Sequence, residues 1–149
     1  MLILCCGNPD RGDDGAGPLV ARRLRAFEVE ARVCGGEALS LMEEWRGADD
    51  VIVVDAVITG ALTGTITVWD ASTAELAPGW FHCSTHSLGV AEAVGMARAM
   101  GRLPKRLRIW GIDGRRFEPG TRAAPAVAKA AGVVAERIAR EIELCTNLP

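Results

Sequence analysis

The sequence predicts an α/β fold in which a largely parallel β-sheet carries helices on both faces. Two stretches, Leu2–Cys6 and Val51–Val54, are continuously apolar, which is typical of strands buried on both faces of a parallel sheet. Segments with apolar residues at helical spacing lie between the predicted strands. The resulting order, β-α-β-α-β-β-α-β-α, favours parallel pairing through helical crossovers.

In the first half, each predicted element follows from a local pattern. The strand 2–6 stops at a Gly-Asn-Pro sequence, and Pro18 lies near the start of the next helix, where its missing N–H costs nothing. In that helix Val20, Leu24 and Phe27 share one face. The predicted elements are a strand over 2–6, a helix from Pro18 to Phe27, a strand over 30–34, a short helix over 38–46 and a strand over 51–54.

The second half begins with an alternating segment, Thr65–Trp69, which predicts a half-exposed strand at the sheet edge. A strand is expected over 107–112. Helices are predicted over 87–100 and from Pro125 onward, the latter with an inner stripe of Val127, Ala131, Val134 and Ile138. Residues 113–124, rich in Gly, Pro and Arg, are expected to form the rim of a site.

Size and charge limit the class of protein. The 149 residues match the usual size of one domain, and no repeat or linker divides them, so a single domain over 1–149 is predicted. The net charge of −2 and the pI of about 5.7 do not suggest nucleic acid or an anionic membrane as a partner, since both demand a clear basic excess. No apolar run is long enough to span a bilayer. We expect a monomer with no nucleic-acid or membrane partner.

The cysteines and the N-terminus indicate a cytoplasmic protein. The five cysteines are odd in number and none is spaced Cys-x-x-Cys, so they are interpreted as reduced thiols. The apolar N-terminus lacks a basic region and runs directly into Gly7-Asn8, which favours a strand over a signal peptide.

Three side chains that can carry chemistry, Asp14, Asp55 and His86, each follow a predicted strand or precede a predicted helix. Ligands of open α/β sheets gather outside the carboxyl ends of the strands, so parallel strands bring the two carboxylates to one edge, where the imidazole can join them. Two carboxylates and one imidazole can bind a divalent metal ion and leave some of its coordination positions free for other ligands.

Simpler interpretations apply to the same residues. Asp13 and Asp14 can cap a helix or face its dipole, and Asp55 can be a turn residue. The first loop lacks the spacing of a phosphate loop, its aspartates would repel phosphate, and no Glu closes an EF-hand. A zinc site at His82-Cys83-x-x-His86 lacks a second ligand pair, and Cys83 as a nucleophile lacks a third group.

Four motifs resemble the nickel–iron hydrogenase maturation endopeptidases, in the family's order and at its spacings. The resemblance covers nearly the whole chain. The motifs are Gly7-Asn8 with Gly12–Leu19, Val53–Ala56, Thr85–Gly89, and Gly111–Asp113 with Phe117–Gly120.

This resemblance implies a fold, an activity and a site. The fold would be a three-layer α/β/α arrangement with a twisted, mostly parallel five-stranded sheet and helices on both faces. The activity would be an endopeptidase cut that removes the C-terminal extension of the hydrogenase large-subunit precursor after nickel insertion. Asp14, Asp55 and His86 would be the catalytic and metal-contacting residues. The nickel would belong to the precursor and would not be held permanently.

One position departs from the family pattern. The family often has an aspartate before the paired glycines that follow its second strand, whereas this chain has Cys34 before Gly35-Gly36. The substitution removes a carboxylate from the groove. Two other functions remain open from the residues, a non-catalytic nickel-sensing or chaperone-like module and a small-molecule-binding α/β protein.

Overall fold

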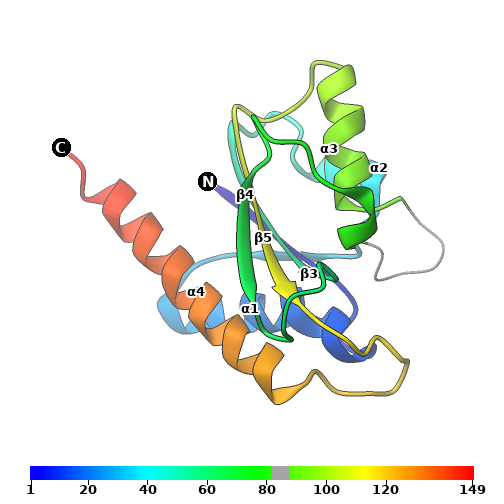
Figure 1. Cartoon of the computed structure of the whole chain (residues 1–149). Coiled ribbons are helices and arrows are strands. Elements are labelled where there is room, and N and C mark those ends of the chain that lie inside the picture. The colour runs from blue at the N-terminus through cyan, green and yellow to red at the C-terminus, as the bar shows by residue number, and fades with distance from the viewer. Residues whose placement is uncertain (82–87) are drawn as a thin grey trace.

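The protein folds around one five-stranded sheet with the strand order β2-β1-β3-β5-β4 (Figure 1). The structure is a computed structural model that describes residues 1–81 and 88–149. Neighbouring strands are parallel except β4, which pairs antiparallel with β5 at one edge. The predicted largely parallel sheet is therefore confirmed, and so is the half-exposed edge strand.

The elements alternate along the chain as the sequence predicts. The strands are β1 (Leu2–Cys6), β2 (Arg32–Cys34), β3 (Asp50–Val57), β4 (Ile66–Asp70) and β5 (Arg106–Asp113). The helices are α1 (Ala16–Leu24), α2 (Ala38–Glu44), α3 (Val90–Ala99) and α4 (Pro125–Thr146), and the 3₁₀ helices are η1 (Gly12–Gly15), η2 (Arg25–Phe27) and η3 (Pro78–Phe81). Within the described ranges, no helix is both long and apolar enough to cross a membrane.

Helices cover both faces of the sheet, which gives the three-layer architecture (Figure 1). On one face, α1 and α4 pack against Ile3, Ile52 and Val54. On the other face, α2 and α3 pack against Leu4, Val51 and Val53. Because successive residues of a strand point to opposite faces, the continuous apolar runs of β1 and β3 supply both cores at once.

Most observed boundaries shift by one to three residues from the expected ones, and two of the differences bear on the site. β3 does not end before Asp55 but continues to Val57, because its pairing with β5 persists to the register pair Val57↔Asp113. The helix predicted over 87–100 begins at Val90. Its N-cap is Gly89, which has an extended backbone and whose N–H donates to Glu92 Oε2 at 2.9 Å.

Gly17 permits the close approach of α1 to β1. A Cβ at Gly17 would lie 2.1 Å from the carbonyl oxygen of Cys6 and 2.7 Å from its backbone nitrogen. Backbone atoms of a buried central strand cannot move aside cheaply. We therefore expect Gly17→Ala to lower the free energy of unfolding by about 2 kcal/mol or more, measured by urea denaturation.

The matched control is Gly95→Ala in the exposed face of α3, where an added Cβ meets no atom within 4 Å. Alanine is the better helix former, so this variant should gain roughly 0.5–1 kcal/mol. Equal effects of the two substitutions would contradict the proposed packing constraint.

Candidate active site at the carboxyl edge of the sheet

Asp14 lies in η1, directly after β1, and its side chain is 7% exposed. Its Oδ2 accepts the backbone N–H of Asn8 at 2.9 Å, and η1 packs against β3. Gly7 makes this turn possible, because it has a φ of +130° and a Cβ there would lie 1.9 Å from the carbonyl oxygen of Asp14. The turn thus folds Asp14 back over the carboxyl end of the sheet.

Asp55 lies inside β3, two positions before the last residue of the strand, and its register partner on β5 is Gly111. The carboxylate is 7% exposed, and its Oδ1 accepts the N–H of Ala56 at 2.9 Å. Burying a carboxylate among apolar residues costs free energy unless the charge is hydrogen-bonded and paired with a cation. Because Asp55 lies within the paired part of β3, it is not the turn residue that the sequence left as an alternative.

The two carboxylates influence each other. Burial raises the pKa of Asp55 well above its ordinary value, and the nearby negative charge of Asp14 raises it further. Burial also raises the pKa of Asp14, while the Asn8 N–H and the Arg11 cation partly oppose that rise. Two buried carboxylates that repel each other form a site where a cation is favoured, because positive charge relieves both the burial and the repulsion.

The third predicted site residue, His86, lies outside the described residues, as do His82 and Cys83 of the zinc and thiol alternatives. The described flanks of residues 82–87 lie near the same edge. The N–H of Ile58, just after β3, donates to the carbonyl of Trp80 at 2.8 Å, and the N–H of Ala38 donates to the carbonyl of Leu88 at 2.9 Å. Among the residues with described positions, no cluster of three potential metal ligands forms. The three-residue site therefore stays a prediction.

Asp13 does not cap a helix, contrary to one sequence-based interpretation, since η1 has no side-chain cap. Its side chain is 1% exposed and anchors the segment 114–124 instead. Oδ2 accepts the backbone N–H groups of Arg115 and Arg116 at 2.8 and 3.0 Å, and Oδ1 accepts that of Ala124 at 2.8 Å. Asp13 thus joins the first loop, which carries Asp14, to the loop predicted to form the rim.

Asp113 makes a second anchor that sequence reasoning missed. Its buried side chain accepts the N–H of Thr59 at 2.8 Å and the hydroxyl of Thr59 at 2.9 Å. Its backbone carbonyl also accepts the N–H of Gly64 at 2.8 Å. The sequence contained a sign of this role, because Asp113 directly follows a predicted strand and belongs to one of the four motifs. Its partner Thr59 could not be identified, because it lies on a turn far away in the sequence.

Cys34, the position that departs from the family pattern, ends β2 at the same edge. Its Sγ lies 3.1 Å from that of Cys6. The hydrogen bond with Cys6 lowers the pKa of Cys34, although burial opposes this effect. The same hydrogen bond, together with burial, raises the pKa of Cys6. The pKa values of the two thiols are therefore shifted in opposite directions. Both thiols lie close enough to Asp55 to interact with it electrostatically.

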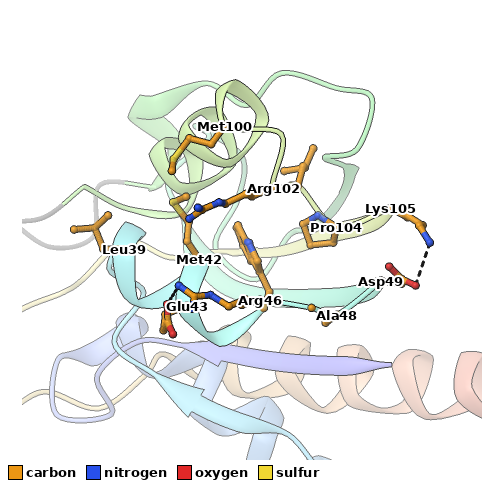
Figure 2. A pocket seen from close by; sticks show the side chains of 13 residues that line it. Leu39, Met42, Glu43, Arg46, Ala48, Asp49, Met100, Arg102, Pro104 and Lys105 are labelled. Atoms are coloured by element: carbon orange, nitrogen blue, oxygen red, sulfur yellow. Dashed lines mark hydrogen bonds and ion pairs between the residues drawn. The ribbon is translucent and has the colours of Figure 1, made fainter.

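A cavity of about 790 Å³ lies at the opposite edge of the sheet (Figure 2). Residues just before β3, including Ala48 and Asp49, and residues just before β5, including Pro104 and Lys105, line it. These positions are at the amino ends of the parallel strands. The cavity is therefore separate from the edge that carries Asp14 and Asp55.

These features define an α/β protein with a buried, acidic site at the carboxyl edge of a mostly parallel sheet. The profile of the hydrogenase maturation proteases (HycI) matches residues 20–141, and the chain belongs to this family. The protein is accordingly a peptidase, and hence a hydrolase.

Solved structures share the fold. A hydrogenase maturation protease HycI from Thermococcus kodakarensis KOD1 is 24% identical, with 95% of this chain and 91% of that chain covered and a TM-score of 0.74. The maturating endopeptidase HybD from E. coli is 21% identical, with 97% and 92% covered and a TM-score of 0.69. The comparison with curated protein sequences finds no match.

Proposed function

We propose that the protein removes the C-terminal extension of a nickel–iron hydrogenase large-subunit precursor after nickel insertion. Asp14, Asp55 and His86 contact the nickel that the precursor carries, and the cut follows this contact. The observation that carries the proposal is the pair of buried carboxylates, Asp14 and Asp55, in a hydrogenase maturation protease.

The charge of the site supports this role. Burial raises the pKa values of both carboxyl groups, and the charge of Asp14 raises that of Asp55 further, so the ionised pair is destabilised until a cation arrives. A nickel ion held by the precursor supplies that charge. Carboxylate oxygens and an imidazole nitrogen suit a divalent ion of this kind, and a site with three such ligands leaves positions open for the precursor's own ligands.

This arrangement explains how the enzyme would discriminate between precursors. A precursor without nickel offers no charge to neutralise the two carboxylates, and its docking would bury them unpaired. A loaded precursor gains the metal contacts. The difference in binding free energy between the two forms is the basis of specificity. Nickel is thus part of the substrate, and it can polarise a carbonyl group or activate water near the scissile bond.

The test uses purified protein and two preparations of the precursor, with and without nickel. Intact-mass measurement should show loss of the C-terminal extension only from the nickel-loaded form. Asp14→Asn should slow that cleavage by about 100-fold or more, a typical loss for a group that acts on the reacting atoms. The matched control is Asp10→Asn, because Asp10 is exposed in the same loop, and it should cleave at the normal rate.

Equal cleavage of the two precursor forms would show that the protein does not recognise nickel. Full activity of Asp14→Asn would show that Asp14 is not part of the active site. Nickel-dependent binding of the precursor with no change in its mass would favour a binding module over the protease.

A further inference from the structure

The two thiols of Cys6 and Cys34 are placed as a disulfide requires. They are register partners at the carboxyl ends of the parallel strands β1 and β2, and their sulfur atoms lie 3.1 Å apart. Neighbouring strands are separated by roughly 4.7–4.9 Å, which falls within the range of about 4.4–6.8 Å between the Cα atoms of a disulfide. A movement of about 1 Å would bring the sulfur atoms to the bonding distance of ~2.05 Å.

The two cysteines differ in access. Cys6 is fully buried, whereas Cys34 is half-buried and reachable from solvent. Gly36 packs directly against Cys6, because a Cβ there would lie only 3.3 Å from the Cβ of Cys6. Cys5 points into the core on the other face of the sheet, and Cys145 is exposed in α4. Neither is in a position to substitute for one member of the pair.

We propose that Cys6 and Cys34 are a reversible redox pair that hydrogen peroxide converts to a disulfide at the edge of the active site. The peroxide oxidises the accessible Cys34 thiol to a sulfenic acid and is itself reduced to water. The Cys6 sulfur then attacks the Cys34 sulfur, forming the S–S bond and releasing the sulfenic oxygen as a second water. A small dithiol reverses the change by thiol–disulfide exchange and is oxidised in turn.

The cross-link would act on the site through the backbone. Gly7 follows Cys6, and its N–H donates to the carbonyl of Cys34 at 3.0 Å. Asn8 comes next, and its N–H holds Asp14. Drawing the two sulfur atoms together therefore displaces the residues that position Asp14. Oxidised protein should process precursor more slowly than reduced protein, a consequence that rests on the proposed function.

The disulfide itself is tested without any activity measurement. The full-length protein is treated with hydrogen peroxide, free thiols are alkylated, and the tryptic peptides are analysed by mass spectrometry. Cleavage after Arg11, Arg32 and Arg46 places Cys6 in peptide 1–11 and Cys34 in peptide 33–46. The expected product is these two peptides joined, with the loss of two hydrogen atoms, and a dithiol should separate them.

Peptide 1–11 also contains Cys5, which makes Cys5→Ser the matched control for Cys6→Ser. The joined peptide should persist in Cys5→Ser and disappear in Cys6→Ser and Cys34→Ser. A joined peptide that survives Cys6→Ser, or oxidation of Cys34 to the sulfinic acid with no joined peptide in the unmodified protein, would overturn the proposal.

The effect on processing is measured separately. Peroxide should slow the unmodified enzyme, a dithiol should restore it, and the rate of Cys34→Ser should no longer respond to this reversible treatment. A joined peptide with an unchanged rate would contradict the coupling to Asp14 while leaving the redox pair in place. A protein that cleaves no precursor in its reduced form would instead count against the proposed function.

Discussion

Asp55→Asn should yield a folded protein that processes nickel-loaded precursor at least about 100-fold more slowly than the unmodified protein. Asparagine has nearly the same shape and retains an oxygen that can accept the N–H of Ala56, as Asp55 does at 2.9 Å. It lacks the negative charge that the proposed metal contact needs. The rate of mass loss from the precursor measures the effect.

The same substitution should stabilise the protein at neutral pH. The pKa of Asp55 is raised in the folded state, so the folded protein binds the proton more tightly than the unfolded chain does. Below the ordinary pKa of 3.8, Asp55 is neutral in both the folded and the unfolded state and does not affect stability. As the pH rises above 3.8 toward the raised value, the unfolded chain ionises first, so the free energy of unfolding falls. Each pKa unit corresponds to about 1.4 kcal/mol, so Asp55→Asn should raise Tm by about 3 °C or more at neutral pH.

This gain should vanish near pH 3 to 4, where aspartate and asparagine are both neutral. Asp49→Asn is the matched control, because Asp49 lies just before the same strand and its side chain forms an exposed ion pair with Lys105. Its Tm and its processing rate should stay close to those of the unmodified protein. A lower Tm for Asp55→Asn at neutral pH would show that the carboxylate stabilises the fold, contrary to this account.

Asp13→Ala should lower the free energy of unfolding by about 3 kcal/mol or more. The substitution leaves three backbone N–H groups, those of Arg115, Arg116 and Ala124, without their acceptor. Hydrogen bonds to a charged group are stronger than neutral ones, and unsatisfied buried donors are costly. A loss of this size corresponds to roughly 6–12 °C in Tm for a chain of this length. Thermal unfolding measures it directly.

Asp13→Asn gives a graded comparison, because it keeps one acceptor oxygen and turns the other into a donor that faces an N–H group. Its loss of stability should fall between that of Asp13→Ala and that of the exposed control Asp10→Ala, which should change little. In Asp13→Ala, amide hydrogen exchange should become faster in residues 114–124, because this segment loses its anchor. Unchanged protection of that segment in Asp13→Ala would refute the anchoring role.

The central elements were predictable because their sequence patterns are local. The apolar runs of β1 and β3 and the inner stripe of α4 each reflect burial, and the buried positions Val127, Ala131, Val134 and Ile138 match the prediction. The end of β3 was not predictable in this way. Asp55 interrupts the apolar pattern, and only pairing with β5 extends the strand beyond it.

The site was predictable in part. Asp14 and Asp55 were expected at the carboxyl edge of the sheet, and the structure brings them together there. The anchoring by Asp13 could not be predicted, because its partners follow more than 100 positions later. The contact between Cys6 and Cys34 depends on the register between β1 and a strand of three residues, which local sequence does not specify.

The proposed processing role is tested by the intact mass of the hydrogenase large subunit in a host that lacks this gene. If this protein performs the cut, the subunit should retain its C-terminal extension, the unmodified gene should restore removal, and Asp14→Asn should not. A subunit of normal, processed mass in the deletion host would contradict the proposed function, because another protease would then perform the cut.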